Sequence, residues 1–274
     1  MNNKKLNKVK KKAQFIRKKI LETVINKGGH LATSFSCADI LTTLYYSGIM
    51  KYDNKNEKWD KRDRLIISKG HAETIIYNIL SDLGFFPKNW LLKHYRSGKY
   101  LMGGHIDSKI PGIEFSTGSL GHGLSLASGM ALGMKKSKNR SNVFVLMSDG
   151  ECTEGSVWEA AIFASKNKLN NIIALIDNNQ ISATDFLKNF TDIGNLKDKF
   201  TAFGWNCFSI DGHSIKKIYS TIKKIKNLKN NKPNIIIANT VKGKGLNSIE
   251  NDPARHTKGL SEMEINDAKK QFKI

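Results

Sequence analysis

The chain has 274 residues, of which 39% are hydrophobic, so it can bury a substantial core as one large α/β domain. Its formal net charge of +21 comes mostly from lysines spread along the whole sequence, with few arginine forks for reading bases, which argues against nucleic-acid binding as its principal function. The three cysteines are scattered, so they predict neither a disulfide framework nor a zinc site. The sequence shows no secretory signal and no apolar run of about 18 residues, so we expect a cytoplasmic protein with no membrane partner.

The first expected element is a helix that ends at Gly28-Gly29. Apolar residues recur along it at three- and four-residue spacing, namely Leu6, Val9, Ala13, Ile16, Ile20 and Val24. The basic cluster at residues 4–19 is therefore interpreted as the solvated face of a packed helix. His30 follows in a loop, and a second apolar helix is expected over residues 37–46.

Histidine follows glycine five times in this sequence, at His30, His71, His105, His122 and His213. Glycine permits a close or strained loop path, and histidine supplies a proton donor or acceptor at neutral pH. As a group these residues suggest a polar site, although any single one could equally satisfy backbone carbonyls or cap a strand end.

A strand at residues 64–68 leads through Lys69, Gly70 and His71 into an apolar helix over residues 71–83. Such a βα turn is where α/β proteins usually contact ligands. Residues 115–134 then predict a glycine-rich loop followed by a helix of small residues. The glycines of this loop run in the reverse order to a dinucleotide fingerprint, so we reject NAD binding. His94 lies outside these settings and is expected at the surface.

Residues 142–182 predict a strand-helix-strand unit, because apolar runs at residues 143–147 and 172–176 flank a segment with helical spacing. Parallel strands joined by one crossover helix end at the same edge of the sheet, so Asp149 and Asn179 should lie close together. Oxygen ligands of this kind suit Mg²⁺ or Ca²⁺, and Gly150 allows the backbone to approach a phosphate. We interpret this stretch as a metal-diphosphate site.

The remaining sequence predicts strands at residues 206–210 and 235–239 around a basic helix. His213, after Asp211-Gly212, is interpreted as part of a strand-end turn without a catalytic role. A glycine-rich turn at residues 240–245 precedes the segment that ends at His256, and Ser261 and Glu264 form a capping-box pattern for a last helix.

These motifs resemble a known family. Asp149-Gly150, followed about thirty residues later by Asn179, resembles the metal-diphosphate signature of thiamine diphosphate enzymes, and Glu154-Gly155-x-x-Trp158-Glu159-Ala160 is similar to its transketolase branch. The segments around His71, His105, the loop at residues 118–123 and His256 also resemble transketolase segments, in the same order. The resemblance implies the thiamine diphosphate-binding fold, a parallel sheet flanked by helices, as a single diphosphate-binding domain over residues 1–274.

The resemblance also implies roles for individual residues. The metal would be held by Asp149, Asn179 and the backbone of Ile181, and the diphosphate would lie near His71 and Gly150. The aminopyrimidine would contact the backbone of Gly118, Ser119 and Leu120, whereas substrate hydroxyls and protons would be handled by His30, His105 and His256. Glu154 would link paired cofactor sites across a dimer, or else be a solvated first-turn residue that favours the helix dipole.

The family domains that this sequence does not match indicate a split enzyme. The pyrimidine-binding and C-terminal domains, with their catalytic glutamate, are absent and are expected on a separate chain, as a 2+2 assembly. The implied activity is that of the N-terminal subunit of a heteromeric transketolase, which moves a two-carbon ketol unit from a ketose phosphate to an aldose phosphate with thiamine diphosphate and Mg²⁺.

Several residues depart from the family pattern. Ser148 and Gln180 stand where the family commonly has glycine; neither removes a metal ligand, but they indicate a specialised pathway, such as an unusual sugar. Arg255 replaces a common tryptophan and Thr257 a usual glycine, which bears on the substrate contacts beside His256, and Ser119 replaces a common proline. Two other interpretations stay open. The chain could be a subunit of a thiamine diphosphate-dependent 2-oxo acid decarboxylase or synthase, or a non-catalytic cofactor-binding protein.

Overall fold

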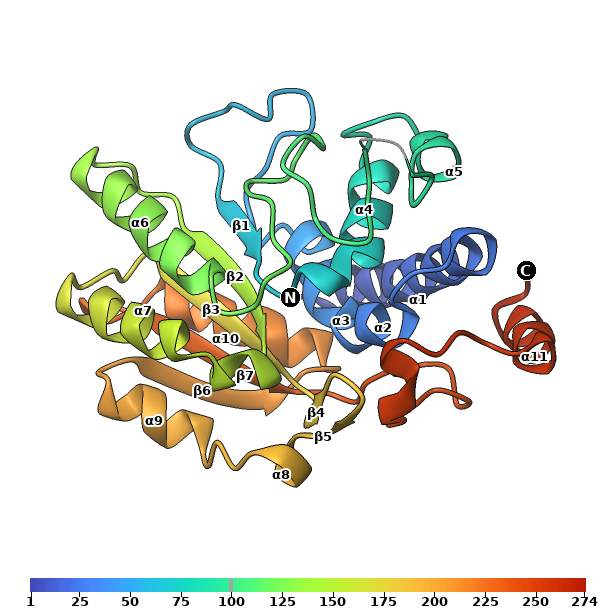
Figure 1. Ribbon diagram of the computed structural model, residues 1–274. Helices are drawn as coiled ribbons and strands as arrows, with labels where there is room; N and C mark the ends of the chain where they lie inside the picture. Colours follow the sequence, from blue (N-terminus) through green and yellow to red (C-terminus); the bar gives the residue numbers. More distant parts are fainter. Residues whose placement is uncertain (99–100) are drawn as a thin grey trace.

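Five parallel strands form the centre of the computed structural model, in the order β1-β2-β3-β7-β6 (Figure 1). The structure describes residues 1–98 and 101–274. The strands of this sheet are β1 (Arg64–Ile67), β2 (Val143–Ser148), β3 (Ile172–Asn178), β6 (Asn206–Asp211) and β7 (Asn234–Asn239). The prediction of an α/β fold built on a parallel sheet is confirmed, with each predicted strand within about two residues of its observed bounds.

The central strands are apolar along nearly their whole length because helices cover both faces of the sheet. Successive side chains of a strand point to opposite faces. In β2, Phe144 and Leu146 join one core cluster, whereas Val143, Val145 and Met147 join the other. This alternation divides the hydrophobic core into two layers, one on each side of the sheet.

The first layer is formed by α1 (Asn3–Lys27), α2 (Leu31–Ser36), α3 (Ala38–Tyr46), α4 (Glu73–Asp82) and α10 (Ile215–Lys226). The second is formed by α6 (Gly123–Lys136), α7 (Gly155–Lys166) and α9 (Leu196–Ala202). Figure 1 shows α6 and α7 side by side over one face, away from the α1 to α4 group. The chain is thus a three-layer α/β/α structure.

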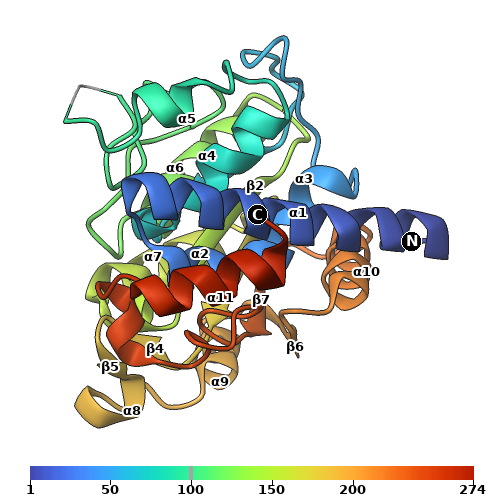
Figure 2. The ribbon, with the colours of Figure 1, turned by 90° about the vertical axis from the view of Figure 1, so that its right-hand side faces the viewer.

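The basic N-terminal cluster lies on α1, as predicted. Its apolar residues Val9, Ala13, Ile16 and Ile20 are buried, whereas most of its lysines are exposed. The last helix, α11 (Glu262–Phe272), runs alongside α1 (Figure 2). The predicted capping box of Ser261 and Glu264 is present.

Short elements complete the edges of the fold. They are α5 (Trp90–Lys93), α8 (Leu187–Phe190), the hairpin strands β4 (Ile181–Ser182) and β5 (Asp185–Phe186), and the 3₁₀ helices η1 (Gly70–Ala72), η2 (Gly150–Thr153) and η3 (Pro253–His256). The helix α2 is absent from the sequence-based prediction, because six residues are too few to show a helical period. No helix among the described residues is long and apolar enough to cross a membrane.

Candidate active site

The carboxyl ends of the strands lie at one edge of the sheet, and the candidate residues gather there. β2 and β3 are neighbours in register, with Ser148 opposite Asp177. Asp149 and Asn179 therefore follow adjacent strands, as the strand-helix-strand pattern predicts. The two turns are in contact, because the Asp149 carboxylate accepts the backbone N–H of Gln180.

The side chains of these turns present oxygen atoms suited to a divalent cation. Burial raises the pKa of Asp149 to about 6, and a cation beside it would favour its charged form. The amide nitrogen of Asn179 donates to Ser36 Oγ at 3.1 Å, and its oxygen accepts the Ile181 N–H at 3.0 Å. One carboxylate, one amide oxygen and one backbone carbonyl match the ligand preferences of Mg²⁺ and Ca²⁺. The residues present therefore fit the ion that the sequence motif implies.

The packing requires glycine at position 150 for a reason other than the approach of a phosphate. A Cβ atom there would lie 2.6 Å from Ser182 Oγ, so Gly150 permits the β4–β5 hairpin to close over the turn. Gln180, where the family commonly has glycine, adopts a positive φ of 62°. That conformation is one that glycine adopts without strain. The approach of a phosphate to Gly150 remains a prediction.

A buried ion pair lies beneath these turns. Lys69, which follows β1, pairs with Asp177 of β3, and neither side chain reaches solvent. Asp177 also accepts hydrogen bonds from Ser36 and Thr240. Burial alone would lower the pKa of Lys69, but Asp177 raises it above its ordinary value. The sequence did not predict this pair, although a lysine directly after a buried strand is an available signal.

Four of the predicted histidines form one cluster. The ring centroid of His30 lies 6.0 Å from that of His71, 6.0 Å from that of His105 and 5.6 Å from that of His256. The ring centroids of His71 and His256 are 5.3 Å apart. Burial lowers the pKa of His256 to about 4 and holds the pKa of His71 well below its usual value, with Lys69 also contributing at His71. Both rings are therefore neutral at neutral pH.

One atom of this cluster lacks a partner. His256 Nδ1 is buried and makes no hydrogen bond within the described part of the chain. Buried polar atoms in folded proteins are normally hydrogen-bonded, so this nitrogen is available to a bound molecule. His256 also lines a cavity of about 550 Å³ together with His30, Arg96 and Thr257.

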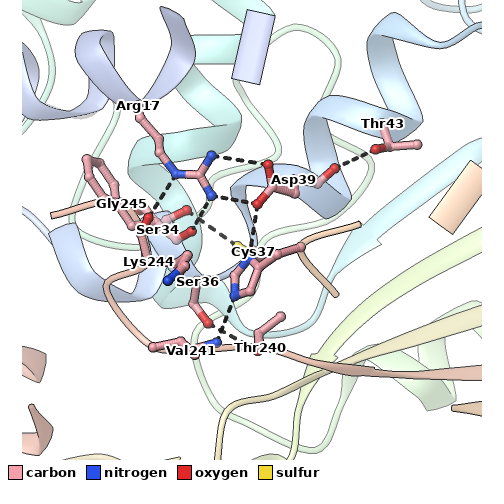
Figure 3. A network of polar contacts seen from close by, with 12 residues as sticks. Arg17, Ser34, Ser36, Cys37, Asp39, Thr43, Thr240, Val241, Lys244 and Gly245 are labelled. Atoms are coloured by element: carbon pink, nitrogen blue, oxygen red, sulfur yellow. Dashed lines mark hydrogen bonds and ion pairs between the residues drawn. The ribbon is translucent and has the colours of Figure 1, made fainter. Parts of the chain in front are cut away.

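The other histidines lie outside the cluster. His213 contacts a network of polar residues around Asp39. In this network Arg17 holds the Asp39 carboxylate at 2.7 and 3.1 Å and also donates to the Lys244 carbonyl (Figure 3). His213 Nδ1 lies 3.0 Å from Asp39, and its Nε2 accepts the Val241 N–H at 2.8 Å. Both ring nitrogens of His213 therefore have partners within the chain.

His94 and His122 are also separate from the cluster. His94 is half-buried against Trp90, not fully at the surface as predicted, and His122 is exposed at the start of α6. Among the described residues, neither His94 nor His122 makes a ring contact with the four clustered histidines.

The loop at residues 117–121 packs beside the histidine cluster. A Cβ atom at Gly118 would lie 3.2 Å from the ring of His105, and one at Gly70 would lie 2.5 Å from the Thr117 carbonyl. Ser119 is exposed and Leu120 is half-buried. The predicted aminopyrimidine contacts thus lie next to His105, with backbone groups close to the turn that carries His71.

Glu154 is exposed at the N-cap of α7, where its side chain makes no capping bond. Its proposed role as a link between paired cofactor sites stays a prediction. The neighbouring acid Glu151, which the sequence did not single out, is fully buried and accepts the Gly121 N–H at 2.9 Å. It also accepts from Ser68 and from the Ser148 N–H, so Ser148 has a defined structural partner.

Arg255 is held within the chain. It bonds to Asp252 at 3.0 Å, to the Gly259 carbonyl at 3.0 Å and to Glu264 of α11. Its guanidinium therefore fixes the segment that carries His256, and it is not free for a substrate. Thr257 is exposed.

The sequence missed a carboxylate beside the histidine cluster. Glu73, at the start of α4, is fully buried, and both of its oxygens lie 3.1 Å from His30 Nδ1. Tyr95 donates to it at 2.8 Å. Burial and the nearby Glu73 raise the pKa of Tyr95.

Comparisons with known proteins agree with this geometry. The family described as "Transketolase, thiamine diphosphate binding domain" matches residues 9–274. An apulose-4-phosphate transketolase subunit from Actinobacillus succinogenes is 38% identical over 252 residues, covering 91% of this chain and 90% of the relative. The 6-deoxy-6-sulfo-D-fructose transketolase subunit SqwG of Clostridium sp. is similar to this chain at the same identity and coverage.

Solved structures show the same relationship. Transketolase from Campylobacter jejuni aligns with a TM-score of 0.86 at 31% identity, covering all of this chain but only 43% of that one. The chain therefore spans less than half of that transketolase and most of the two related subunits. It belongs to the transketolase family, by its match to the family's thiamine diphosphate-binding domain over residues 9–274.

Proposed function

We propose that this chain is the N-terminal subunit of a heteromeric transketolase, which transfers a two-carbon ketol unit from a ketose phosphate to an aldose phosphate. One observation carries the proposal. The Asp149 and Asn179 turns, which fit a metal-diphosphate group, lie at the same sheet edge as His71, which clusters with His30, His105 and His256.

Thiamine diphosphate, when bound, supplies the electron sink for cleavage of a carbon-carbon bond. On this chain Asp149, Asn179 and the Ile181 carbonyl would hold Mg²⁺ or Ca²⁺, and His71 and Gly150 would contact the diphosphate. The backbone of Gly118, Ser119 and Leu120 would contact the aminopyrimidine. The oxygen donor set of the two turns and the buried Asp149 carboxylate support the metal assignment.

His30, His105 and His256 would bind substrate hydroxyls and move protons. A neutral imidazole carries one N–H donor and one acceptor nitrogen, which matches a hydroxyl that both donates and accepts. The lowered pKa of His256 keeps its ring neutral at pH 7, and its unpartnered Nδ1 is one such contact point.

A second chain would complete the enzyme. The two relatives are themselves named as transketolase subunits, which supports a partner chain here. We propose that the partner carries the pyrimidine domain and the catalytic glutamate. Two copies of each chain would form a 2+2 assembly in the cytoplasm. On this chain the exposed Glu154 and the exposed apolar residues Ile162 and Phe163 of α7 would face another subunit. Purification of the chain from its source cells should recover a second chain that carries a pyrimidine-type domain, and its absence would contradict this assembly.

The two related subunits are named for ketoses that carry a phosphate or a sulfonate group. We propose an anionic ketose as the donor here as well. Assays of the assembled enzyme with ketose phosphates should show ketol transfer. A requirement for a 2-oxo acid with release of CO₂ would instead establish the decarboxylase alternative.

The site assignment is tested by Asp149→Ala in the assembled enzyme. Removal of the only carboxylate among the proposed ligands should abolish Mg²⁺-dependent binding of thiamine diphosphate, measured by calorimetry. Asp192→Ala, which changes an exposed aspartate in a loop, is the matched control and should bind normally. Unchanged affinity in Asp149→Ala would refute the metal assignment.

A further inference from the structure

The buried carboxylate of Glu73 collects hydrogen-bond donors from three sides. Tyr95 Oη donates to Oε1 at 2.8 Å, Thr74 Oγ1 donates to Oε1 at 3.3 Å, and His30 Nδ1 lies 3.1 Å from both oxygens. Glu73 itself has no exposed surface. Burial of a carboxylate costs free energy unless hydrogen bonds compensate it, so this arrangement is a specific feature of the site.

The contact with Glu73 determines which nitrogen of His30 carries a proton. A carboxylate accepts hydrogen bonds, so Nδ1 of His30 must be the donor. In a neutral ring the other nitrogen, Nε2, is then an acceptor. Within the described part of the chain Nε2 makes no hydrogen bond, and the ring lines the cavity next to His256.

The backbone around His30 is shaped to permit this contact. Gly29 has a φ of 132°, and a Cβ atom there would lie 2.4 Å from Tyr95 Oη and 2.9 Å from Thr74 Oγ1. Any side chain at this position would push the hydroxyl groups away from Glu73. Tyr95 and Thr74 are themselves fully buried. The loop, α4 and Tyr95 therefore fix the carboxylate against Nδ1.

We propose that Glu73 is a positioning residue, which holds His30 in the Nδ1–H tautomer so that Nε2 accepts a proton from a substrate hydroxyl. When that O–H bond breaks, its electron pair stays on the substrate oxygen, the Nε2 lone pair forms the new N–H bond, and the ring becomes an imidazolium beside the Glu73 carboxylate. The charge is stabilised there by the ion pair. The substrate part of this inference rests on the proposed transketolase function, whereas the tautomer does not.

The tautomer is measured on the full 274-residue chain labelled with ¹⁵N-histidine. Couplings from the ring carbon-bound protons to the two nitrogens identify the protonated one, and a His30→Asn variant assigns the signals. We expect His30 to carry its proton on Nδ1 at neutral pH. A proton on Nε2, alone or in a doubly protonated ring, would overturn the proposal.

Glu73→Gln tests the carboxylate at constant size. Oε1 would remain with Tyr95, so the new amide group would take the place of Oε2 and donate to His30 Nδ1. His30 should switch to the Nε2–H tautomer, which is the outcome of replacing the aspartate of a catalytic triad by asparagine. An unchanged Nδ1–H tautomer in Glu73→Gln would overturn the proposal, and the wild-type measurement decides it if this variant does not fold.

Two controls separate positioning from general damage. Tyr95→Phe removes a donor to Glu73 but keeps the carboxylate, so His30 should retain its Nδ1–H tautomer. His213, whose Nδ1 faces Asp39 and whose Nε2 accepts from Val241, should show the same tautomer in all variants.

Activity of the assembled enzyme provides a second readout. Glu73→Gln should lower kcat by about tenfold to hundredfold with a smaller change in KM, because it removes proton acceptance but not the binding contacts. A change in KM alone would overturn the proton-accepting role. Failure of ketol transfer in the wild-type assembly would count against the proposed function and would leave the tautomer result intact.

Discussion

Lys69 and Asp177 form an ion pair that is completely shielded from solvent at the carboxyl edge of the sheet. The pair ties the turn after β1 to β3. Through Asp177 it also holds Ser36 of α2 and Thr240 after β7. Four segments that are far apart in the sequence thus meet on one carboxylate, directly beneath the proposed metal ligand Asn179, whose amide lies 3.4 Å from Asp177.

Lys69→Met should therefore destabilise the protein strongly. Removal of the lysine leaves Asp177 charged and buried, which costs about 3–5 kcal/mol in comparable buried pairs. Urea denaturation should show a lower midpoint. The double variant Lys69→Met, Asp177→Leu removes both charges and should recover part of the loss, and a single variant as stable as wild type would contradict this account of the pair.

The network of Arg17, Asp39 and His213 should stabilise the folded protein, and this stabilisation should be lost in acid. Burial alone would raise the pKa of Asp39, but His213 and Arg17 lower it below its ordinary value. The stabilisation is therefore present above pH about 4, the ordinary pKa of aspartate, and is lost as the pH falls through the lower folded value.

Unfolding free energies measured across the acid range test this prediction. Asp39→Asn should lose less stability than wild type as the pH falls, because it lacks the titrating group. Asp198→Asn, at an exposed position of α9, should follow the wild-type curve. Parallel curves for wild type and Asp39→Asn would show that the network does not act in this way.

The sequence predicted those parts of the site that depend on strand topology. Asp149 and Asn179 follow apolar runs joined by one helix, and the geometry of parallel strands brings such positions together whatever the rest of the chain does. The apolar stripe of α1 was predictable for the same reason, because its period is local.

The partners inside the site were not predictable in this way. Asp177 appears in the sequence only as the polar end of an apolar strand, and its partner Ser36 lies 141 residues away. Glu73 appears as an ordinary first-turn acid of a helix, although it is fully buried against His30 and Tyr95. Pairings across such distances depend on how the layers pack, which no local period records.

Gly29→Ala should disturb the loop that carries His30. The φ of 132° is strained for any residue with a side chain, and the new Cβ would collide with Tyr95 Oη. We expect a loss of about 1–3 kcal/mol in the free energy of unfolding, measured by urea denaturation. Gly103→Ala is the matched control, because a Cβ there meets no atom within 4 Å. Equal stability of the two variants would show that the Gly29 conformation is not required.

The pKa of His256 should respond to Lys242. Burial is the larger cause of its low value, about 4, and the positive charge of Lys242 is the next. In Lys242→Met the pKa of His256, followed by NMR of its ring protons, should rise but stay below the ordinary value of about 6.5, because the burial remains. Lys244→Met, which removes a more exposed lysine paired with Glu250, should leave it unchanged.

The same low pKa has a consequence for stability. Because the folded value lies below the unfolded value, the unfolded chain binds a proton first as the pH falls from about 6.5 toward 4, and wild type should lose stability over that range. Lys242→Met should lose less, since its His256 accepts a proton more readily in the folded state. A His256 that titrates near 6.5 in wild type would contradict both expectations, and would place a charged ring beside His30 and His71 in mildly acidic solution.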